Sequence, residues 1–257
     1  MGTAELTSPH LSPQATLPAD PARGRPAGML ARAGLLWIAC TLATAVACEL
    51  GRPGGVDLIR PTFSELIFTT VGARLVGVSM VSLACASICI AFALICRQAP
   101  TDGLALASIA GWTGALVLAA VFPMTQVGAP PTWYDRLHTC TALVGLICLP
   151  VAGLRLAVRF RADPRWQSTA TLVRVLSVVS LLGIAAFLAT FVPVPSPFWL
   201  LGARQYSGIT ERIPLAANIA LLATLAAAVL RVATRPRSFH AGGVRLRDHM
   251  RATLDHD

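Results

Sequence analysis

The chain has 257 residues, of which 55% are hydrophobic and only 13% are charged, and its formal net charge is +9. An average soluble domain carries about 25% charged residues, so this composition excludes an ordinary water-soluble domain and favours a chain surrounded by lipid. Although the positive charge could suit nucleic acid, the arginines lie in short loops between apolar runs and are not interleaved with aromatic residues. We therefore expect membrane lipids as partners and no nucleic acid.

The chain begins with a segment, residues 1–28, that is rich in Pro, Ala, Thr and Ser and has no apolar periodicity. Such a composition cannot bury enough apolar surface to fold, so we expect a disordered cytoplasmic tail. The apolar run that follows is too long for a signal peptide, and no cleavage-like site ends it. Residues 29–233 are then expected to form the membrane domain, and residues 234–257 a basic cytoplasmic tail.

A bilayer core about 30 Å thick is crossed by about 20 helical residues, and several apolar segments reach that length. They are residues 30–50, 72–96, 104–124, 137–158, 171–193 and 214–232. The sequence thus predicts an all-α fold, a polytopic membrane bundle of six transmembrane helices. Small residues four apart, as at Ala107/Gly111 and Ala110/Gly114, indicate seams where helices can approach closely.

The distribution of arginine between the loops predicts the orientation. Fourteen arginines lie in the two tails and around the 97–103 and 159–170 loops, whereas five lie in the other three loops. The positive-inside rule then puts both termini in the cytoplasm. Trp133, Tyr134 and Tyr206 are expected in an outer aromatic belt, and Trp166 at the inner surface.

The three loops expected on the outer face carry most of the polar side chains beside the membrane. Acids and bases beside a bilayer are unfavourable unless they are paired or hydrated, so such a cluster is the first place to look for function. The first loop contributes Asp57, Arg60, Ser64, Glu65 and Arg74, the second Thr125, Gln126, Tyr134, Asp135 and His138, and the third Arg204, Tyr206, Glu211 and Arg212.

Glu65, His138 and Asp135 are the candidate catalytic residues. Glu65 precedes three apolar residues, a setting suited to a general acid or base. Asp135 lies one helical turn before His138 and could orient its ring for proton transfer. In the structural alternative, Ser64 caps the second span or a turn leading into it, Glu65 stabilises the positive end of that helix, and His138 is a hydrogen-bonded structural residue.

The candidate substrate-binding residues come from the same loops. They are Asp57, Arg60, Ser64, Arg74, Glu211 and Arg212. The arginines could clamp a lipid phosphate or a substrate carboxylate. Alternatively, Arg74 pairs with Glu49 and Arg212 with Asp57 or Glu65, because acids and arginines nearly balance in these loops.

No pattern indicates a metal or a cofactor. The seven cysteines lie inside apolar runs without a CxxC motif or paired Cys/His spacing, so we expect them to be packing residues. The chain contains no Gly-rich phosphate loop, HExxH or GxSxG sequence. No predicted span carries a charge at mid-depth, which disfavours an ion-coupled transporter.

Several short motifs together carry a resemblance to a known family. They are Asp57-Leu-Ile-Arg-Pro-Thr-Phe-Ser-Glu-Leu66, Phe122-Pro123, Leu137-His138-Thr139, Asp163-Pro-Arg-Trp166 and Gly208-Ile-Thr-Glu-Arg212. In this order, across residues 30–232, they resemble the bacterial membrane proteins called domain of unknown function 998. The resemblance implies a six-helix protein of the bacterial cytoplasmic membrane with no agreed activity. Members often have an acid two residues beyond Phe-Pro, where this chain has Thr125, which puts in doubt any mechanism that needs a carboxylate there.

We expect a non-catalytic role, that of a membrane partner or lipid-binding protein whose outer loops form a hydrogen-bonded cap. The alternative is a membrane-embedded enzyme that acts on a lipid or isoprenoid-like substrate, and a small-molecule transporter is a third. Geometry discriminates between the first two. An open pocket between Glu65 and His138 would favour the enzyme, and a filled interface in which each acid is capped by an arginine would favour the structural role.

Overall fold

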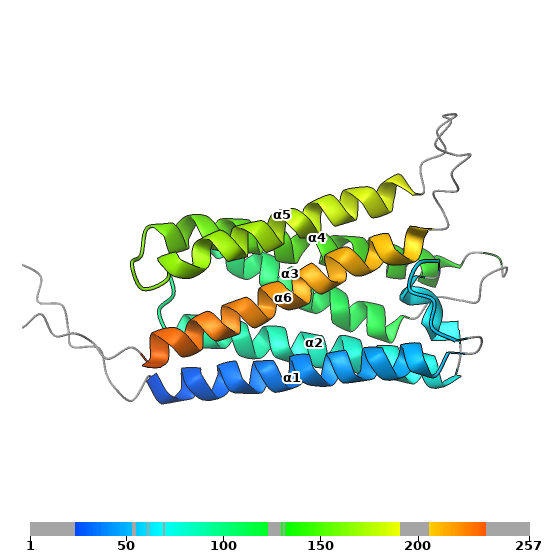
Figure 1. Ribbon diagram of the computed structural model, residues 1–257, viewed down its shortest axis with the longest axis horizontal. Coiled ribbons are helices and arrows are strands. Elements are labelled where there is room, and N and C mark those ends of the chain that lie inside the picture. Colours follow the sequence, from blue (N-terminus) through cyan, green and yellow to red (C-terminus); the bar gives the residue numbers. More distant parts are fainter. Residues whose placement is uncertain are drawn as a thin grey trace, which may run out of the picture.

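The computed structural model describes residues 24–234 of the chain, apart from residues 53–54, 61, 69, 123–129, 131 and 191–205. The described residues form α-helices and one short 3-10 helix, and no strand occurs among them (Figure 1). The elements are α1 (Gly24–Leu50), η2 (Ser64–Phe68), α2 (Thr70–Cys96), α3 (Gly103–Val121), α4 (Trp133–Arg161), α5 (Gln167–Ala189) and α6 (Ser207–Thr234).

All 6 α-helices are long and apolar enough to cross a membrane, which confirms the predicted all-α bundle. All 6 begin before the spans expected for them, at Gly24, Thr70, Gly103, Trp133, Gln167 and Ser207. Helices commonly extend past the hydrocarbon core, and α6 does so although Pro214 lies inside it. Neighbouring helices in a membrane can satisfy the backbone groups that a proline frees. Residues 1–23 and 235–257, which make up most of the two predicted tails, lie outside the described part of the chain.

The helices pack in chain order, and the bundle closes on itself. Each α-helix contacts the next one along the chain, and α6 also contacts α1, α2 and α4. In Figure 1, α6 crosses the bundle between α5 and the α1–α2 pair. The start of α1 and the end of α6 lie at one end, which we call the terminal end. The opposite end, formed by the end of α1, by η2 and by the first turns of α2, α4 and α6, is the cap end.

Close approaches between helices occur where side chains are small. A Cβ atom added at Gly153 of α4 would lie 2.1 Å from Ser177 Oγ and 2.9 Å from Leu221 Cδ2, so α4 closely approaches both α5 and α6. At Gly111 the added atom would lie 3.1 Å from Cys148 Sγ, which confirms a close approach of α3 to α4. At Gly114 nothing lies within 4 Å, so this residue does not lie on a seam within the bundle.

Buried polar contacts also join the helices. Asn218 of α6 accepts a hydrogen bond from Ser180 Oγ of α5 at 2.8 Å, and its Nδ2 donates to Leu146 O of α4 at 3.5 Å. Trp112 Nε1 of α3 donates to Ser87 Oγ of α2 at 2.9 Å. Polar groups buried in a membrane protein need such partners because lipid offers none.

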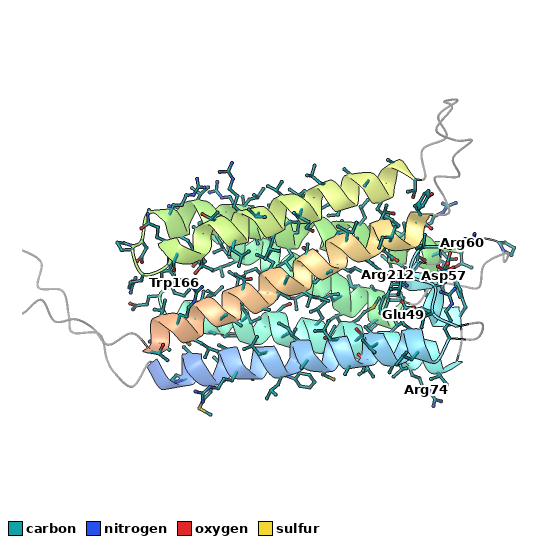
Figure 2. All side chains as sticks on the ribbon, in the orientation of Figure 1. Glu49, Asp57, Arg60, Arg74, Trp166 and Arg212 are labelled. Atoms are coloured by element: carbon teal, nitrogen blue, oxygen red, sulfur yellow. The ribbon has the colours of Figure 1, made fainter. Side chains whose placement is uncertain are left out.

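Trp166 lies at the terminal end (Figure 2), but it is buried and does not face a membrane surface. Its side chain is fully buried and stacks on Phe160, with ring centroids 5.0 Å apart (Figure 2 labels Trp166). The turn before α5, in which Trp166 N donates to Asp163 O, folds the ring back against the last turn of α4. By contrast, Trp133, Tyr134 and Tyr206 are exposed at the cap end.

Candidate functional site

Asp57 organises the turn in the connection from α1 to η2. One oxygen of its carboxylate, Oδ1, accepts hydrogen bonds from the backbone N–H groups of Ile59 at 2.9 Å and Arg60 at 3.2 Å. These bonds, and then the positive charge of Arg60, hold the pKa of Asp57 below its usual range. Arg52 Nη1 donates to the carbonyl oxygen of Asp57 at 3.1 Å, so the turn is also fixed to the end of α1.

The residues that follow Asp57 are hydrogen-bonded to the start of α6. Ile209 N donates to Ile59 O at 3.2 Å, and Ser207 Oγ donates to Arg60 O at 2.9 Å. Because the acceptors are backbone carbonyl groups of the loop, these bonds do not depend on the loop's side chains. The first extramembrane connection of the chain is therefore held by its last helix.

The segment that leads into α2 is capped locally. Thr62 Oγ1 accepts from Glu65 N at 3.3 Å, and the carboxylate of Glu65 accepts from Thr62 N at 3.2 Å. This reciprocal pair is a capping box at the start of η2. Ser64, the residue predicted to cap, is instead the first residue of η2, and its side chain lies outside the described part of the structure. Glu65 lies in the first turn as predicted and is exposed.

Two neighbouring residues of α6 bind the rest of the cap. Glu211 is buried and accepts a short hydrogen bond from the backbone N–H of Phe63. Arg212 forms an ion pair with Glu49 of α1 and donates to Leu58 O at 3.2 Å. Through these contacts α6 reaches both α1 and the loop between α1 and η2.

The ion pair differs from the pairings expected from sequence. Arg74 was expected to pair with Glu49, but Glu49 pairs with Arg212 because α1 closes the bundle against α6. Figure 2 shows Glu49 and Arg212 together within the cap end, with Asp57 and Arg60 beside them. Arg74 lies at the outer edge of the bundle and is exposed, as is Arg60.

The start of α4 has a second capping box. Thr132 N and Thr132 Oγ1 donate to Oδ2 of Asp135 at 2.6 and 2.7 Å. His138 is buried, and its Nδ1 lies 2.9 Å from Phe122 O at the end of α3. The carboxylate expected to orient the imidazole thus caps a helix, while the imidazole contacts a backbone carbonyl group that α3 leaves unpaired.

Three aromatic rings from the end of α3 and the start of α4 contact one another. Phe122 and Tyr134 stack with centroids 5.8 Å apart, and Trp133 and Tyr134 stack at 3.8 Å. Two other predicted residues of the second loop, Thr125 and Gln126, lie outside the described residues, as does Arg204 of the third loop.

A small pocket, of about 30 Å³, lies at the cap end between the last turn of α1 and the segment formed by η2 and the start of α2. None of Glu65, His138 and Asp135 lines it. Among the described residues, no group of three or more His, Cys, Asp or Glu side chains could hold a metal ion. Thr62 and Thr132 are not among the residues predicted from sequence, although their spacing from Glu65 and Asp135 follows the capping-box pattern.

Comparison with known proteins identifies the family. The model of a family described as proteins of unknown function (DUF998) matches residues 29–228. The chain belongs to this family. The match confirms the resemblance found in the sequence, and no curated protein and no solved structure matches the chain. This DUF998 protein is therefore an integral membrane protein of unknown activity, with six helices able to span a membrane.

The motifs that carry the DUF998 resemblance are concentrated at one end of the bundle. The segment from Asp57 to Leu66, Phe122, the Leu137–Thr139 segment and the Gly208–Arg212 segment all belong to the cap end, whereas Asp163–Trp166 lies at the terminal end. The cap end thus contains most of the short motifs that distinguish the chain from an arbitrary bundle of apolar helices.

Proposed function

We propose that this DUF998 protein is a non-catalytic lipid-binding protein of the bacterial cytoplasmic membrane, with both termini in the cytoplasm and the cap end facing outward. The proposal rests on one observation, which is that the carboxylates at the cap end are already hydrogen-bonded or ion-paired. Each accepts a hydrogen bond within the cap or belongs to an ion pair there; they are Glu49, Asp57, Glu65, Asp135 and Glu211. A catalytic acid or base must instead face a substrate.

The exposed arginines supply the lipid-binding part of the proposal. Arg60 and Arg74 extend from the cap with exposed side chains, at the level where the apolar helices end. Guanidinium groups bind phosphate well, and a basic residue near an anionic membrane surface contributes about 1 kcal/mol to its attraction. The acids of the cap stabilise the fold, and these arginines meet the headgroups.

The enzymatic alternative requires Glu65 and His138 to act on one substrate. Its support is weaker because Glu65 is exposed on η2 and binds Thr62 N, whereas His138 is buried on α4 and contacts Phe122 O. A membrane protein partner is also compatible with an engaged set of acids. Val56, Leu58 and Ile59, in the loop between α1 and η2, are exposed apolar residues that could face such a partner or the lipid interface.

The abundance of point variants tests the non-catalytic role. His138→Ala removes the contact with Phe122 O and leaves a cavity, so it should lower the amount of folded protein in the membrane. His138→Asn offers an amide donor near the position of Nδ1 and should recover part of that amount. Full abundance of His138→Ala and Glu65→Ala together with loss of a cellular phenotype would instead establish the enzymatic alternative.

Lipid composition tests the binding role. The protein, extracted with a polymer that retains its surrounding lipids, should carry more anionic phospholipid than the bulk membrane does. An unrelated six-helix membrane protein extracted from the same cells is the control. Equal lipid composition in the two samples would contradict lipid binding.

Thiol labelling tests the orientation. In a variant without native cysteines, Arg60→Cys should react on intact cells with a reagent that does not cross the membrane. Arg165→Cys, which is also exposed but lies at the terminal end, should react only after the cells are opened. The reverse pattern would contradict the proposed orientation.

A further inference from the structure

The loop between α1 and η2 exposes apolar side chains although it lies outside the spans predicted from sequence. Val56, Leu58 and Ile59 are between 45% and 55% exposed. Neighbouring apolar side chains that a fold leaves uncovered mark a surface that contacts another protein or a membrane. We call these three residues the loop patch.

The loop patch belongs to a fixed turn. Gly55, with a φ of 89°, reverses the chain immediately before Val56, a conformation that glycine adopts without steric cost. Asp57 Oδ1 then accepts from the backbone N–H groups of Ile59 and Arg60. The carboxylate of this turn is thus bound to its own backbone, while the apolar side chains on both sides of it stay exposed.

Hydrogen bonds to α6 place the loop patch at the level where the apolar surface of that helix begins. Leu58 O accepts from Arg212 Nη1 and Ile59 O accepts from Ile209 N, both at 3.2 Å. Ile209 and Ile213 are themselves exposed, on a helix apolar enough to cross a membrane. The loop patch therefore adjoins the outer surface of the first two turns of α6, at the cap end of the bundle (Figure 1).

The side chains around the loop patch suit the boundary between headgroups and acyl chains. Tyr206, just before the start of α6, and Arg60, just after Ile59, are both exposed. Tyrosine is enriched at membrane–water interfaces, and an arginine there keeps its aliphatic stem among apolar groups while its guanidinium group reaches the headgroups. A soluble protein would have to displace lipid to reach the patch, because the patch lies beside the first turns of a membrane helix.

We propose that Val56, Leu58 and Ile59 insert into the boundary between the headgroups and the acyl chains of the leaflet at the cap end. The loop is then an interfacial anchor, which sets the depth of this end of the bundle by removing apolar surface from water. Every phospholipid bilayer offers such a boundary. The inference therefore goes beyond the proposed binding of anionic lipid and does not rest on it.

Spin labels at single cysteines measure the depth of the loop. In a chain without native cysteines, placed in liposomes of phosphatidylcholine, Leu58→Cys and Ile59→Cys each carry a nitroxide. Oxygen concentrates among the acyl chains, whereas a nickel complex stays in water. We expect the ratio of collision rates, oxygen to nickel, to be several-fold higher at both positions than at Ala162→Cys, and to approach the ratio at Ile213→Cys. Ala162 is exposed in the connection from α4 to α5, at the terminal end.

Two results would overturn the proposal. A ratio like that of Ala162→Cys would show that the loop faces water, where a soluble partner could reach it. Low collision rates with both reagents, with spectra broadened by a second nearby label, would show that the patch faces another copy of the chain. Neither result tests the enrichment of anionic phospholipid on which the proposed function depends, so the two can fail separately.

A measurement on the unmodified chain avoids any effect of the substitutions. A carbene reagent that partitions among the acyl chains is activated by light in the same liposomes, and the labelled residues are located by mass spectrometry. Val56, Leu58 and Ile59 should be labelled like Ile213, and Ala162 should stay unlabelled. Label at Ile213 without label in the loop would contradict insertion.

Discussion

Glu49, in the last turn of α1, and Arg212, in the second turn of α6, form the ion pair that joins the first helix of the bundle to the last. The two side chains are only 13% and 16% exposed, so neither charge is well hydrated if its partner is lost. The same guanidinium group donates to Leu58 O. One residue of α6 thus stabilises both the closure of the bundle and the position of the cap loop.

Breaking this pair should destabilise the protein more than removing an exposed arginine. We expect Glu49→Gln and Arg212→Met each to lower the free energy of unfolding by about 3 kcal/mol, because each leaves an uncompensated charge. The double variant should lose less than the sum of the two. Arg74→Gln, which removes an exposed charge, is the control and should stay within about 0.5 kcal/mol. Unfolding in detergent measures all four, and additive single effects would show that the two side chains are not coupled.

Gly153→Ala should be strongly destabilising. The added Cβ would lie 2.1 Å from Ser177 Oγ and 2.9 Å from Leu221 Cδ2, so these side chains must shift or the helices must move apart, at a cost of about 1–3 kcal/mol. Ser177→Ala in the same chain should recover part of the loss, because it removes the oxygen but not the contact with Leu221. Gly114→Ala, where nothing lies within 4 Å, is the matched control and should leave the melting temperature unchanged or higher. Similar losses at both glycines would contradict the packing described here.

The buried contact of Asn218 predicts a smaller effect. Asn218→Leu removes the bonds with Ser180 Oγ and Leu146 O, and Ser180→Ala removes only the first. Hydrogen bonds between membrane helices contribute about 0.6 kcal/mol on average, and at most about 1.7 kcal/mol, in double-mutant cycles. We expect a coupling energy in this range from a cycle of the two variants. A coupling near zero would mean that each residue finds another partner when the other is replaced.

Asp102 predicts a pH dependence that originates at the terminal end. Its Oδ1 accepts from Ala105 N at 2.8 Å as the N-cap of α3, and its Oδ2 accepts from Arg155 Nη2 at 2.7 Å. The backbone bond, then the Arg155 guanidinium group, hold the pKa of Asp102 below its usual range. A carboxyl group with a lowered folded pKa stabilises the fold above its unfolded pKa of about 3.9, and this stabilisation is lost as the pH falls through the folded pKa.

The corresponding variants isolate that contribution. Asp102→Asn keeps a capping oxygen but loses the charge, so its melting temperature should fall less steeply than that of the wild type below about pH 4. Asp102→Ala loses both the cap and the ion pair and should be the less stable of the two at pH 7. If the difference in melting temperature between wild type and Asp102→Asn stayed constant from pH 7 to pH 3, the carboxylate would not be the source.

The membrane helices could be predicted from sequence because the thickness of the bilayer dictates their length. The capping boxes were also predictable, because Thr62 with Glu65 and Thr132 with Asp135 are local pairs. The partner of Glu49 could not be predicted, since it depends on which helix closes the bundle against α1. The spacing of Asp135 and His138 suggested a proton-transfer pair, but the third residue of a helix is also where a capping acid lies. The carboxylate of Asp135 caps the start of α4.

The hydrogen bonds between α6 and the loop that follows α1 have a consequence for membrane insertion. Membrane proteins are made and inserted from the N-terminus, at about 5–20 residues per second. Arg212 follows Glu49 by 163 residues, so Glu49 cannot form this ion pair until most of the chain has been synthesised. A ribosome that stops before residue 207 leaves Glu49 and the Asp57 turn without their attachment. Such a nascent chain lacks the contacts that close the bundle at its cap end.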